Sequence, residues 1–361
     1  MSIFSLSIQG VRNLHNVSLN LDERINFFIG PNGSGKTSLL EAIYLLGMAR
    51  SFRTHLYNKV VHHEKEQLTV FGHIIDQDVD AKMGVQKNKD GDTQIHINQQ
   101  ICRQSSSLAH YLPLQLYYAD SFKIIDSSSK IRREILDWGV FHVKQDYFKV
   151  YAQYQRILKQ RNAWLRLGNH KTYSWDKMLS DCAEDIHQMR LNYFKQFLPF
   201  FEKVITHFFG FPLTMHYFKG WGHGNTEEDH EPLEIYLEKD KERDRKMGYT
   251  HHGPHRADIY IKRDHQWVKD FFSRGQQKLV IVAIKLAQGL LLSQIANKKC
   301  VYLFDDLQAE FDEHHLSMVL EYLNEIPGQM VFTGTQYFSG FSSLLNVTQN
   351  KMFHVKQGEI F

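Results

Sequence analysis

The sequence has few cysteines and no long uncharged apolar run. Its 361 residues include three cysteines, Cys102, Cys182 and Cys300, and so sparse and odd a set excludes a fold stapled by disulfides. The longest apolar run, residues 279–296, is interrupted by Lys285, so no segment has the uncharged length that a membrane span needs. The beginning of the chain has no basic segment before an apolar core, so no secretory signal is expected. These absences predict a cytoplasmic protein without a membrane partner.

The overall charge and the histidines indicate no particular ligand by themselves. Lys and Arg number 43 against 40 Asp and Glu, which leaves a net charge of +3, and 42% apolar residues exclude intrinsic disorder. The 21 histidines include the pairs His62/His63, His251/His252 and His314/His315. No Cys-x-x-Cys or H-E-x-x-H spacing accompanies them, so the sequence predicts no metal site built on histidine.

Strand patterns and helix patterns occupy different parts of the chain. Residues 1–101 alternate as short strands around one helical segment, and residues 121–209 have the 3.6-residue period of helices. Strand patterns return after residue 245. This order predicts one sheet domain, formed by residues 1–120 and 246–361, into which a mainly helical lobe of residues 121–245 is inserted.

A glycine-rich turn between an apolar strand and a helix matches G-x-x-x-x-G-K-[ST] in full. Its residues are Gly30, Pro31, Asn32, Gly33, Ser34, Gly35, Lys36 and Thr37, followed by Ser38. In such a loop the backbone N–H groups wrap phosphates, the lysine reaches the β- and γ-phosphates, and the hydroxyl faces Mg²⁺. The motif predicts that residues 30–38 bind a nucleoside triphosphate, ATP first, with Lys36 as a catalytic residue and Thr37 as a metal ligand.

A second motif places two carboxylates at the end of another apolar strand. The run at 301–304 is followed by Asp305 and Asp306. A P-loop needs an acidic residue at the end of a neighbouring strand to complete the metal site. We therefore expect Asp305 to bind Mg²⁺ together with Thr37, and Asp306 to orient or deprotonate the attacking water.

A third motif, Ser273-Arg274-Gly275-Gln276-Gln277, opens an apolar helix. Ser273 is a favoured N-cap, and Gly275 leaves N–H groups of the first turn able to approach an anion. Alone, the motif also fits a capped helix that binds nothing. The order of P-loop, long insertion, S-x-G-Q and apolar strand with aspartate is the arrangement of the ABC ATPases.

Along nearly its whole length the chain resembles the RecF family of bacterial DNA-repair ATPases. The motifs most specific to this family are I-R-R-E-I-L-D-W at 131–138, L-K-Q-R-N at 158–162 and G-P-H-R-A-D at 253–258. The resemblance also includes V-R-N at 11–13, S-F-R at 51–53 and D-D-L-Q-A-E-F-D at 305–312. The resemblance implies an α/β fold, an ABC-type P-loop ATPase head with a mixed sheet and flanking helices. It also implies the inserted helical lobe and no long coiled coil.

The same resemblance implies an ATP-dependent DNA-binding protein of DNA replication and recombinational repair, active in gap repair and SOS induction. Its cofactors would be ATP and Mg²⁺. A homodimer would form on ATP, with Ser273, Gly275 and Gln276 of one subunit closing over the P-loop of the other. Its partners would be single-stranded, gapped or junction DNA and the mediator proteins RecR and RecO. The resemblance further assigns Arg12 and Asn13 to nucleotide binding, and Gln115 to metal sensing and catalysis.

Two features depart from transporter-type ABC ATPases. Asp306 stands where they usually have glutamate, and its shorter side chain predicts slow hydrolysis, suited to a conformational switch that DNA stimulates. After the apolar strand at 329–332, Thr333, Thr335 and Gln336 stand where a switch histidine is expected. The residue that senses the γ-phosphate therefore stays open among these three.

A local excess of positive charge marks the helical block. Residues 121–171 carry 11 Lys and Arg against 4 Asp and Glu, whereas residues 226–244 carry 9 acidic and 3 basic residues. Phosphate backbones bind basic surfaces through counterion release. The candidate DNA-binding residues are Arg132, Arg133, Lys149, Arg156, Lys159 and Arg161. The alternative is that these residues are only the solvated faces of amphipathic helices.

Two other functions are open at this point. A P-loop ATPase that acts on a protein or solute partner, such as the nucleotide-binding subunit of a transporter, would share the three motifs. A nucleotide-dependent scaffold that never hydrolyses would share them too. The effect of DNA on ATP turnover distinguishes these functions from the first.

Overall fold

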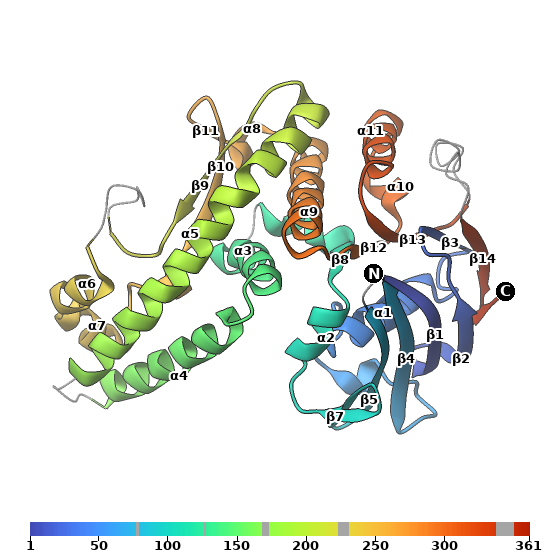
Figure 1. The fold of residues 1–361 in the computed structure, drawn as a ribbon, viewed down its shortest axis with the longest axis horizontal. Helices are drawn as coiled ribbons and strands as arrows, with labels where there is room; N and C mark the ends of the chain where they lie inside the picture. The colour runs from blue at the N-terminus through green and yellow to red at the C-terminus, as the bar shows by residue number, and fades with distance from the viewer. Residues whose placement is uncertain (77–78, 126–127, 168–172, 223–230, 337–349) are drawn as a thin grey trace. The chain divides into compact units, whose positions relative to one another are not determined.

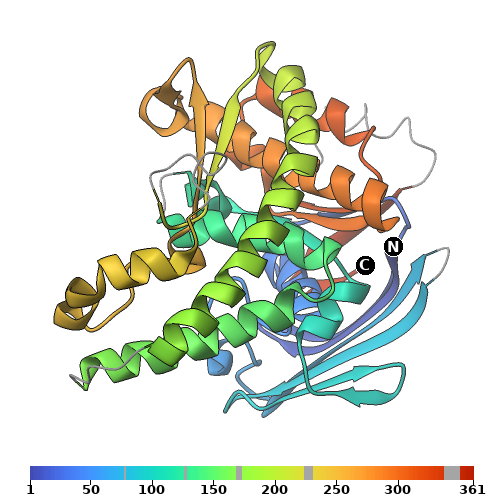
Figure 2. The same cartoon turned by 60° about the vertical axis from the view of Figure 1, so that its left-hand side comes forward.

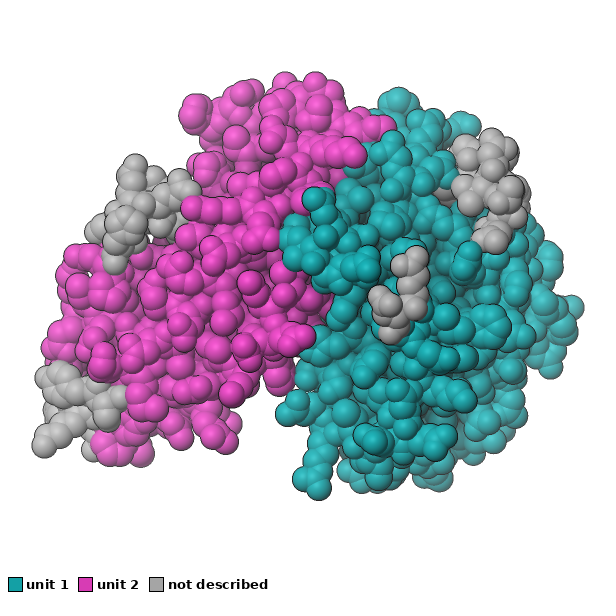
Figure 3. Space-filling model, in the orientation of Figure 1, with its two compact units in different colours: residues 1–122, 274–361 teal, residues 123–273 magenta. Residues whose placement is uncertain are grey.

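The computed structural model of the chain describes residues 1–76, 79–125, 128–167, 173–222, 231–336 and 350–361. Two compact units divide the chain, as Figure 3 shows in teal and magenta. The first unit consists of residues 1–122 and 274–361, and the second of residues 123–273. The chain thus leaves the first unit once and returns to it, as expected for an inserted lobe.

A mostly parallel sheet lies in the first unit, with strand order β15-β14-β3-β13-β12-β8. Its strands are β3 (Ile25–Ile29), β8 (Leu114–Tyr117), β12 (Cys300–Phe304), β13 (Gly328–Gly334), β14 (Lys351–Lys356) and β15 (Glu359–Ile360). The pairings from β14 through to β8 are all parallel. Strands β3 and β12 are apolar or buried throughout, as strands covered on both faces must be. Because these strands are parallel, β3 and β12 end at the same edge of the sheet.

The same unit holds an antiparallel sheet with strand order β2-β1-β4-β5-β6-β7. Its strands are β1 (Ser2–Val11), β2 (Leu14–Asn20), β4 (Gln67–Asp76), β5 (Val79–Asn88), β6 (Thr93–Ile97) and β7 (Gln100–Cys102). Helix α1 (Lys36–Met48) contacts strands of both sheets (Figure 1). Its side chains Leu39, Leu40 and Ile43 are fully buried in their common core. The two sheets thereby fix the helix that begins at Lys36.

Helix α9 (Arg274–Ala296) is the one helix of the described residues with the length and hydropathy of a membrane span. Its most apolar window is 67% buried inside the protein. The helix contacts β12 and β8, and Gly289 allows the Tyr302 ring to approach its backbone closely. These contacts are those of a core helix that covers one face of the parallel sheet. Short helices complete the unit: α2 (Ser106–Tyr111), α10 (Leu307–Glu310) and α11 (Glu313–Leu323).

Long helices dominate the second unit: α3 (Ser129–Val143), α4 (Tyr147–Arg166) and α5 (Tyr173–Phe209) (Figure 2). Shorter helices follow, α6 (Leu233–Lys239), α7 (Lys241–Met247) and α8 (Val268–Phe271). Helix α5 contacts α3, α4 and α6, and its buried side chains include Phe194, Phe197 and Phe201. The helical period read from the sequence in this region therefore corresponds to helices that pack on one another.

A small sheet belongs to this second unit as well. Its strand order is β11-β10-β9, with β9 (Thr214–Phe218), β10 (Asp258–Arg263) and β11 (Gln266–Trp267). The sequence put the boundary of the inserted lobe at 245/246, whereas the compact units divide at 273/274. The pairing of β10 with β9 explains the difference, because it joins residues 258–262 to a strand inside the lobe.

Candidate nucleotide-binding site

The glycine-rich turn joins the end of β3 to the start of α1, as the sequence predicts. Gly35 has φ of 120°, a backbone conformation that side chains disfavour, and Gly30 lies so close to Val355 that a Cβ there would stand 2.1 Å from its carbonyl oxygen. Lys36 is 8% exposed, and its Nζ donates to the carbonyls of Gly30 at 2.6 Å and Pro31 at 2.9 Å. The ammonium thus lies over the turn itself, where phosphates bind in a P-loop.

Thr37 and Asp305 come together at the ends of their elements. The Thr37 hydroxyl lies 3.0 and 3.1 Å from the two carboxylate oxygens of Asp305. Asp305 directly follows β12, and burial raises its pKa, while hydrogen bonds from Thr333 and Thr37 oppose that rise. A hydroxyl and a carboxylate in contact are oxygen ligands of the kind that Mg²⁺ prefers. The pair expected from the sequence is therefore assembled.

Thr333 holds both aspartates of the second motif in place. Its Oγ1 donates to Asp305 at 2.9 Å and accepts a 3.1 Å hydrogen bond from the Asp306 backbone N–H. Thr333 is 3% exposed, so it cannot swing toward solvent, whereas Thr335 and Gln336 are exposed. Asp306 has φ of 49°, the left-handed region that aspartate tolerates better than most residues. The threonine therefore holds the Asp305 carboxylate and the backbone of Asp306.

A cavity of about 400 Å³ lies between these parts of the first unit. Its lining contains Asn13, Asn32, Gly33, Gly35, Lys36, Thr37, Ser38, Asp305 and Asp306, all of them expected from the sequence. Arg53, Ala119, Ala309 and Glu310 line it too and were not expected there. The S-F-R motif at 51–53 was the available signal for Arg53, and it was assigned no role. The buried Ser34 hydroxyl has no hydrogen-bond partner among the described residues.

Two residues assigned by resemblance lie elsewhere. Arg12 does not line the cavity: its guanidinium donates to both oxygens of the fully buried Glu41 at 2.8 and 2.9 Å, and to the Lys59 carbonyl at 2.5 Å. Gln115 is 4% exposed within β8, and its amide donates to Gln288 of α9 at 3.3 Å, so its side chain is turned into the core. Neither side chain lines the cavity as expected: Glu41 holds that of Arg12, and that of Gln115 faces Gln288.

The third motif lies at the start of α9. Gly275 and Gln276 belong to the first turn of this helix and are not among the residues that line the cavity, and Ser273 directly precedes the helix. A role for these three residues toward the cavity of their own chain is therefore not supported.

The candidate DNA-binding residues fall into two groups. Arg132 pairs with Asp258 at 2.7 and 2.8 Å, Arg133 donates to the Ala257 carbonyl at 2.7 Å, and Arg161 is completely buried. Arg161 therefore serves the interior of the second unit, and its assignment to a DNA surface is corrected, whereas Arg132 and Arg133 are partly exposed and stay candidates. Lys149, Arg156 and Lys159 are exposed along α4 and stay candidates.

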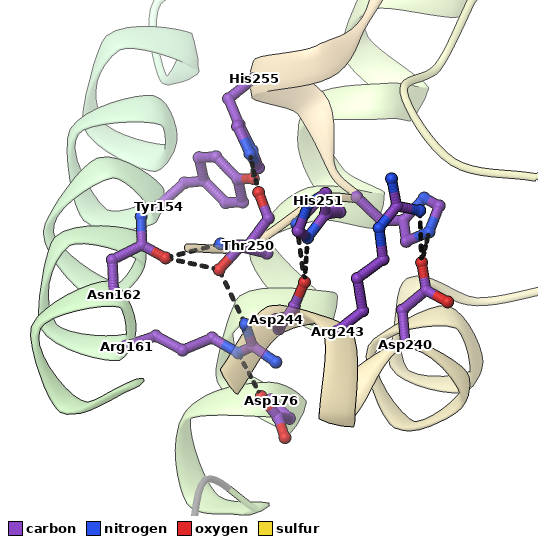
Figure 4. A network of polar contacts seen from close by, with 11 residues as sticks. Tyr154, Arg161, Asn162, Asp176, Asp240, Arg243, Asp244, Thr250, His251 and His255 are labelled. Atoms are coloured by element: carbon purple, nitrogen blue, oxygen red, sulfur yellow. Dashed lines mark hydrogen bonds and ion pairs between the residues drawn. The ribbon is translucent and has the colours of Figure 1, made fainter. Parts of the chain in front are cut away.

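Arg161 lies at the centre of a buried polar network (Figure 4). Its guanidinium donates to Asp176 at 2.6 Å, to Asp244 at 2.7 Å and to the Thr250 hydroxyl at 2.8 Å. Asn162 accepts from the backbone N–H and the hydroxyl of Thr250 at 2.9 and 2.7 Å. The L-K-Q-R-N motif of α4 is thereby tied to the segment that leads into the G-P-H-R motif.

His255 of the G-P-H-R motif extends this network. His255 Nε2 lies 3.1 Å from the Thr250 carbonyl, which can only accept, so Nδ1 is the nitrogen that accepts from the Tyr154 hydroxyl at 2.6 Å. Burial lowers the pKa of His255 to about 4. Two of the three most specific motifs, those at 158–162 and 253–258, thus contribute to one set of contacts inside the second unit.

Known proteins resemble the chain over its full length. A family model described as the RecF/RecN/SMC N terminal domain matches residues 2–354. The DNA replication and repair protein RecF of Pseudomonas syringae pv. tomato is 40% identical over 365 residues, which cover 100% of this chain and 98% of the relative. The chain belongs to the RecF family. RecF of Azotobacter vinelandii is equally similar, at 40% identity over 100% of this chain and 98% of the relative.

Solved structures agree with this membership at the level of the fold. A RecF structure described as the recombination mediator protein RecF-ATP in the RecFOR pathway has a TM-score of 0.87, with 24% identity over 100% of this chain and 97% of the other. An SMC head bound to the C-winged helix domain of ScpA has a TM-score of 0.60, with 15% identity over 100% of this chain and 96% of the other. The ABC-type α/β head expected from the sequence is confirmed. RecF membership also favours the DNA-repair interpretation over the transporter subunit.

Proposed function

We propose that this chain is an ATP-binding protein of DNA replication and recombinational repair, acting in gap repair and SOS induction. In this proposal it binds DNA as a dimer that ATP holds together, and slow hydrolysis releases it. The observation that carries the proposal is the contact of Thr37 with Asp305 beside Lys36, around one cavity. Membership in the RecF family supports the cellular role.

The residues at and around the cavity fit a nucleoside triphosphate with its metal ion. The buried Ser34 hydroxyl, which has no hydrogen-bond partner among the described residues, is a group that phosphate oxygens would satisfy, and so is the Lys36 ammonium, which donates to the Gly30 and Pro31 carbonyls of its own loop. Thr37 and Asp305 would hold Mg²⁺, which when bound neutralises charge on the phosphates. Arg53 is placed to add a second cation to the lining.

Hydrolysis needs a carboxylate that orients water, and Asp306 is our candidate. It lines the cavity, and its backbone N–H is fixed by Thr333. Aspartate is one methylene shorter than glutamate, so we expect slow turnover. We also expect DNA to stimulate this turnover, as the proposed role in DNA repair requires. Measuring ATP turnover with and without DNA tests this expectation. The proposal is contradicted if the turnover rate is the same with and without DNA and if the affinity for DNA does not depend on nucleotide.

The dimer is proposed from the third motif. Ser273, Gly275 and Gln276 do not line the cavity of their own chain, and we propose that they close over the nucleotide of a second copy. Mixing Lys36→Arg with Ser273→Arg subunits should restore one working composite site, whereas each variant alone should be inactive. Mixed samples as inactive as the separate ones contradict a shared site. Molecular mass in solution with ATP, with ADP and without nucleotide gives an independent measurement.

The DNA surface is proposed on α4. Lys149, Arg156 and Lys159 are exposed, and their spacing of seven and three residues puts them on neighbouring parts of one helix face. Each phosphate that a cation neutralises adds about 0.9 to the slope of log affinity against log salt. Replacing all three by alanine should weaken DNA binding and lower that slope by about 2 to 3.

A matched control removes the same charge from another helix of the same unit. Lys177, Lys195 and Lys203 are exposed along α5, and their triple alanine variant should bind DNA nearly as wild type does. Equal losses in the two triple variants would mean that only net charge matters, which contradicts a surface on α4. The mediator proteins RecR and RecO are proposed as partners from family membership, and the solved relative's description names the RecFOR pathway.

A further inference from the structure

Two histidines and a glutamate gather at the β1–β2 turn, outside the nucleotide cavity. His15 is the second residue of β2, while His62 and Glu64 follow Val61, which forms an antiparallel bridge with Val11. The backbone fixes this meeting: the Arg12 N–H donates to the Val60 carbonyl and the His62 N–H donates to the Gly10 carbonyl, both at 2.8 Å. Two segments that are far apart in the sequence are therefore held side by side at this point.

The three side chains converge. One ligand atom from each of His15, His62 and Glu64 lies within 4.8 Å of the others, and no second group of this kind occurs among the residues that the structure describes. The rings of His15 and His62 have centroids 4.1 Å apart and are tilted by 51°. In a tetrahedral zinc site, ligand atoms at about 2.0 Å from the ion stand about 3.3 Å apart. The atoms therefore need to close by about 1.5 Å at most.

The burial of the three residues suits that closure. His62 is 3% exposed and is anchored by its backbone, whereas His15 and Glu64 are exposed and their side chains can rotate. His62 Nδ1 accepts from the Glu64 N–H at 3.2 Å, which is the long end of the normal range. An ion that takes the Nδ1 lone pair displaces only a weak contact. One fixed ligand and two adjustable ones can thus meet around a single ion.

We propose that His15, His62 and Glu64 bind one divalent transition-metal ion, Zn²⁺ first. Two imidazoles and one carboxylate form a ligand set that zinc takes with water in the fourth position, whereas Mg²⁺ and Ca²⁺ prefer oxygen ligands alone. The site is therefore chemically distinct from the Thr37 and Asp305 pair, which offers oxygen only. The sequence carried no recognised zinc spacing, because the ligands come from two segments joined by tertiary structure.

The ion would fasten residues 60–64 to the turn that carries Asn13. Asn13 lines the nucleotide cavity and accepts from the Ser38 hydroxyl at 2.9 Å. Tying the segment down stabilises the side of the cavity that Asn13 forms. Bound zinc should accordingly raise the thermal stability of the protein in the absence of nucleotide.

The experiment uses the full chain, stripped with a chelator and free of nucleotide. Titration calorimetry with Zn²⁺ should give about one ion per chain. His15→Ala and Glu64→Gln, which replace exposed side chains, should each weaken binding by at least about tenfold. His55→Ala is the matched control, since His55 is an exposed histidine of the same segment that is outside the group, and it should bind zinc as wild type does.

Co²⁺ provides a second measurement, because its visible absorption reports coordination by the protein. Wild type and His55→Ala should show the same absorption, and His15→Ala should lose it. The proposal is overturned if wild type binds no Zn²⁺, if His15→Ala and Glu64→Gln bind it as tightly as wild type, or if His55→Ala weakens binding as much as they do. Mg²⁺ titrated in place of Zn²⁺ should give no binding that depends on His15.

Discussion

The nucleotide cavity of the first unit and the Arg161 network of the second use similar residues in opposite ways. In the cavity, Lys36 and Asp306 line a space of about 400 Å³. In the network, Arg161 and its two aspartates are at most 5% exposed at the side chain and pair with one another. Lys36, Asp306 and Arg161 all come from sequence motifs. The difference teaches that a motif of charged residues marks a ligand site only where the fold leaves a space beside it.

Removing the central charge of the network should have the largest effect. Arg161→Met keeps much of the volume but leaves Asp176 and Asp244 buried without their cation, and breaking a buried pair in this way costs about 3–5 kcal/mol of unfolding free energy. All five tryptophans lie in residues 123–273, so their fluorescence during urea unfolding reports the second unit. Lys159→Met, an exposed change on the same helix, should shift the midpoint little. Equal shifts for the two variants would mean that the network contributes nothing special.

Removing the central charge of the cavity should act on activity and spare the fold. Lys36→Ala takes away the ammonium at the phosphate site, and loss of one such donor lowers turnover by about 10²–10³-fold. The tryptophan-detected unfolding of the second unit should stay as in wild type. Turnover that survives the substitution contradicts the assignment of the cavity.

Acid should weaken the network. The pKa of His255 in the folded state is about 4, lowered first by burial, while an ordinary histidine has about 6.5. As pH falls below the unfolded value, the unfolded chain binds a proton that the folded chain refuses, so stability is lost between these two values. From about pH 7 to about pH 5, His255 alone accounts for a loss of about 2 kcal/mol.

His255→Gln isolates this contribution from other acid-sensitive groups. The pKa of His187 is also lowered to about 4 by burial, and this histidine is present in both proteins. The variant should therefore be less stable than wild type near neutral pH, because the Tyr154 contact is altered, and should lose less stability on acidification. Parallel losses in the two proteins would show that His255 is not the group responsible.

Local patterns in the sequence were sufficient to predict which residues come together at the candidate nucleotide site. The P-loop is one contiguous motif between a strand and a helix, and the apolar run before Asp305 could only be a buried strand, so both parts of the site were predictable. What failed depended on partners distant in the chain. Arg161 pairs with an aspartate 83 residues away, and Gln115 meets an amide 173 residues away. No spacing rule reveals such contacts.

The position of Arg161 on its helix indicates burial already in the sequence. It lies three residues after Leu158 and four before Leu165, and these leucines belong to the apolar stripe that predicted α4. A charged residue on such a stripe faces the core, whereas Lys159 lies on the other side of the helix. Helix phase alone would have separated the interior arginine from the exposed candidates.

Thr333→Val should have the smallest effect and the most specific one. Valine keeps the shape of threonine but removes the hydroxyl that bonds to the Asp305 carboxylate and accepts from the Asp306 N–H. Loss of one such hydrogen bond costs about 1–1.5 kcal/mol, so we expect turnover to fall about tenfold. Because Thr333 does not line the cavity, nucleotide affinity should change little, and kcat should fall without a matching rise in KM. Thr333→Ser, which keeps the hydroxyl, should recover most of the turnover. If Thr333→Val and Thr333→Ser reduce kcat equally, packing around residue 333 and not the hydroxyl positions the two aspartates.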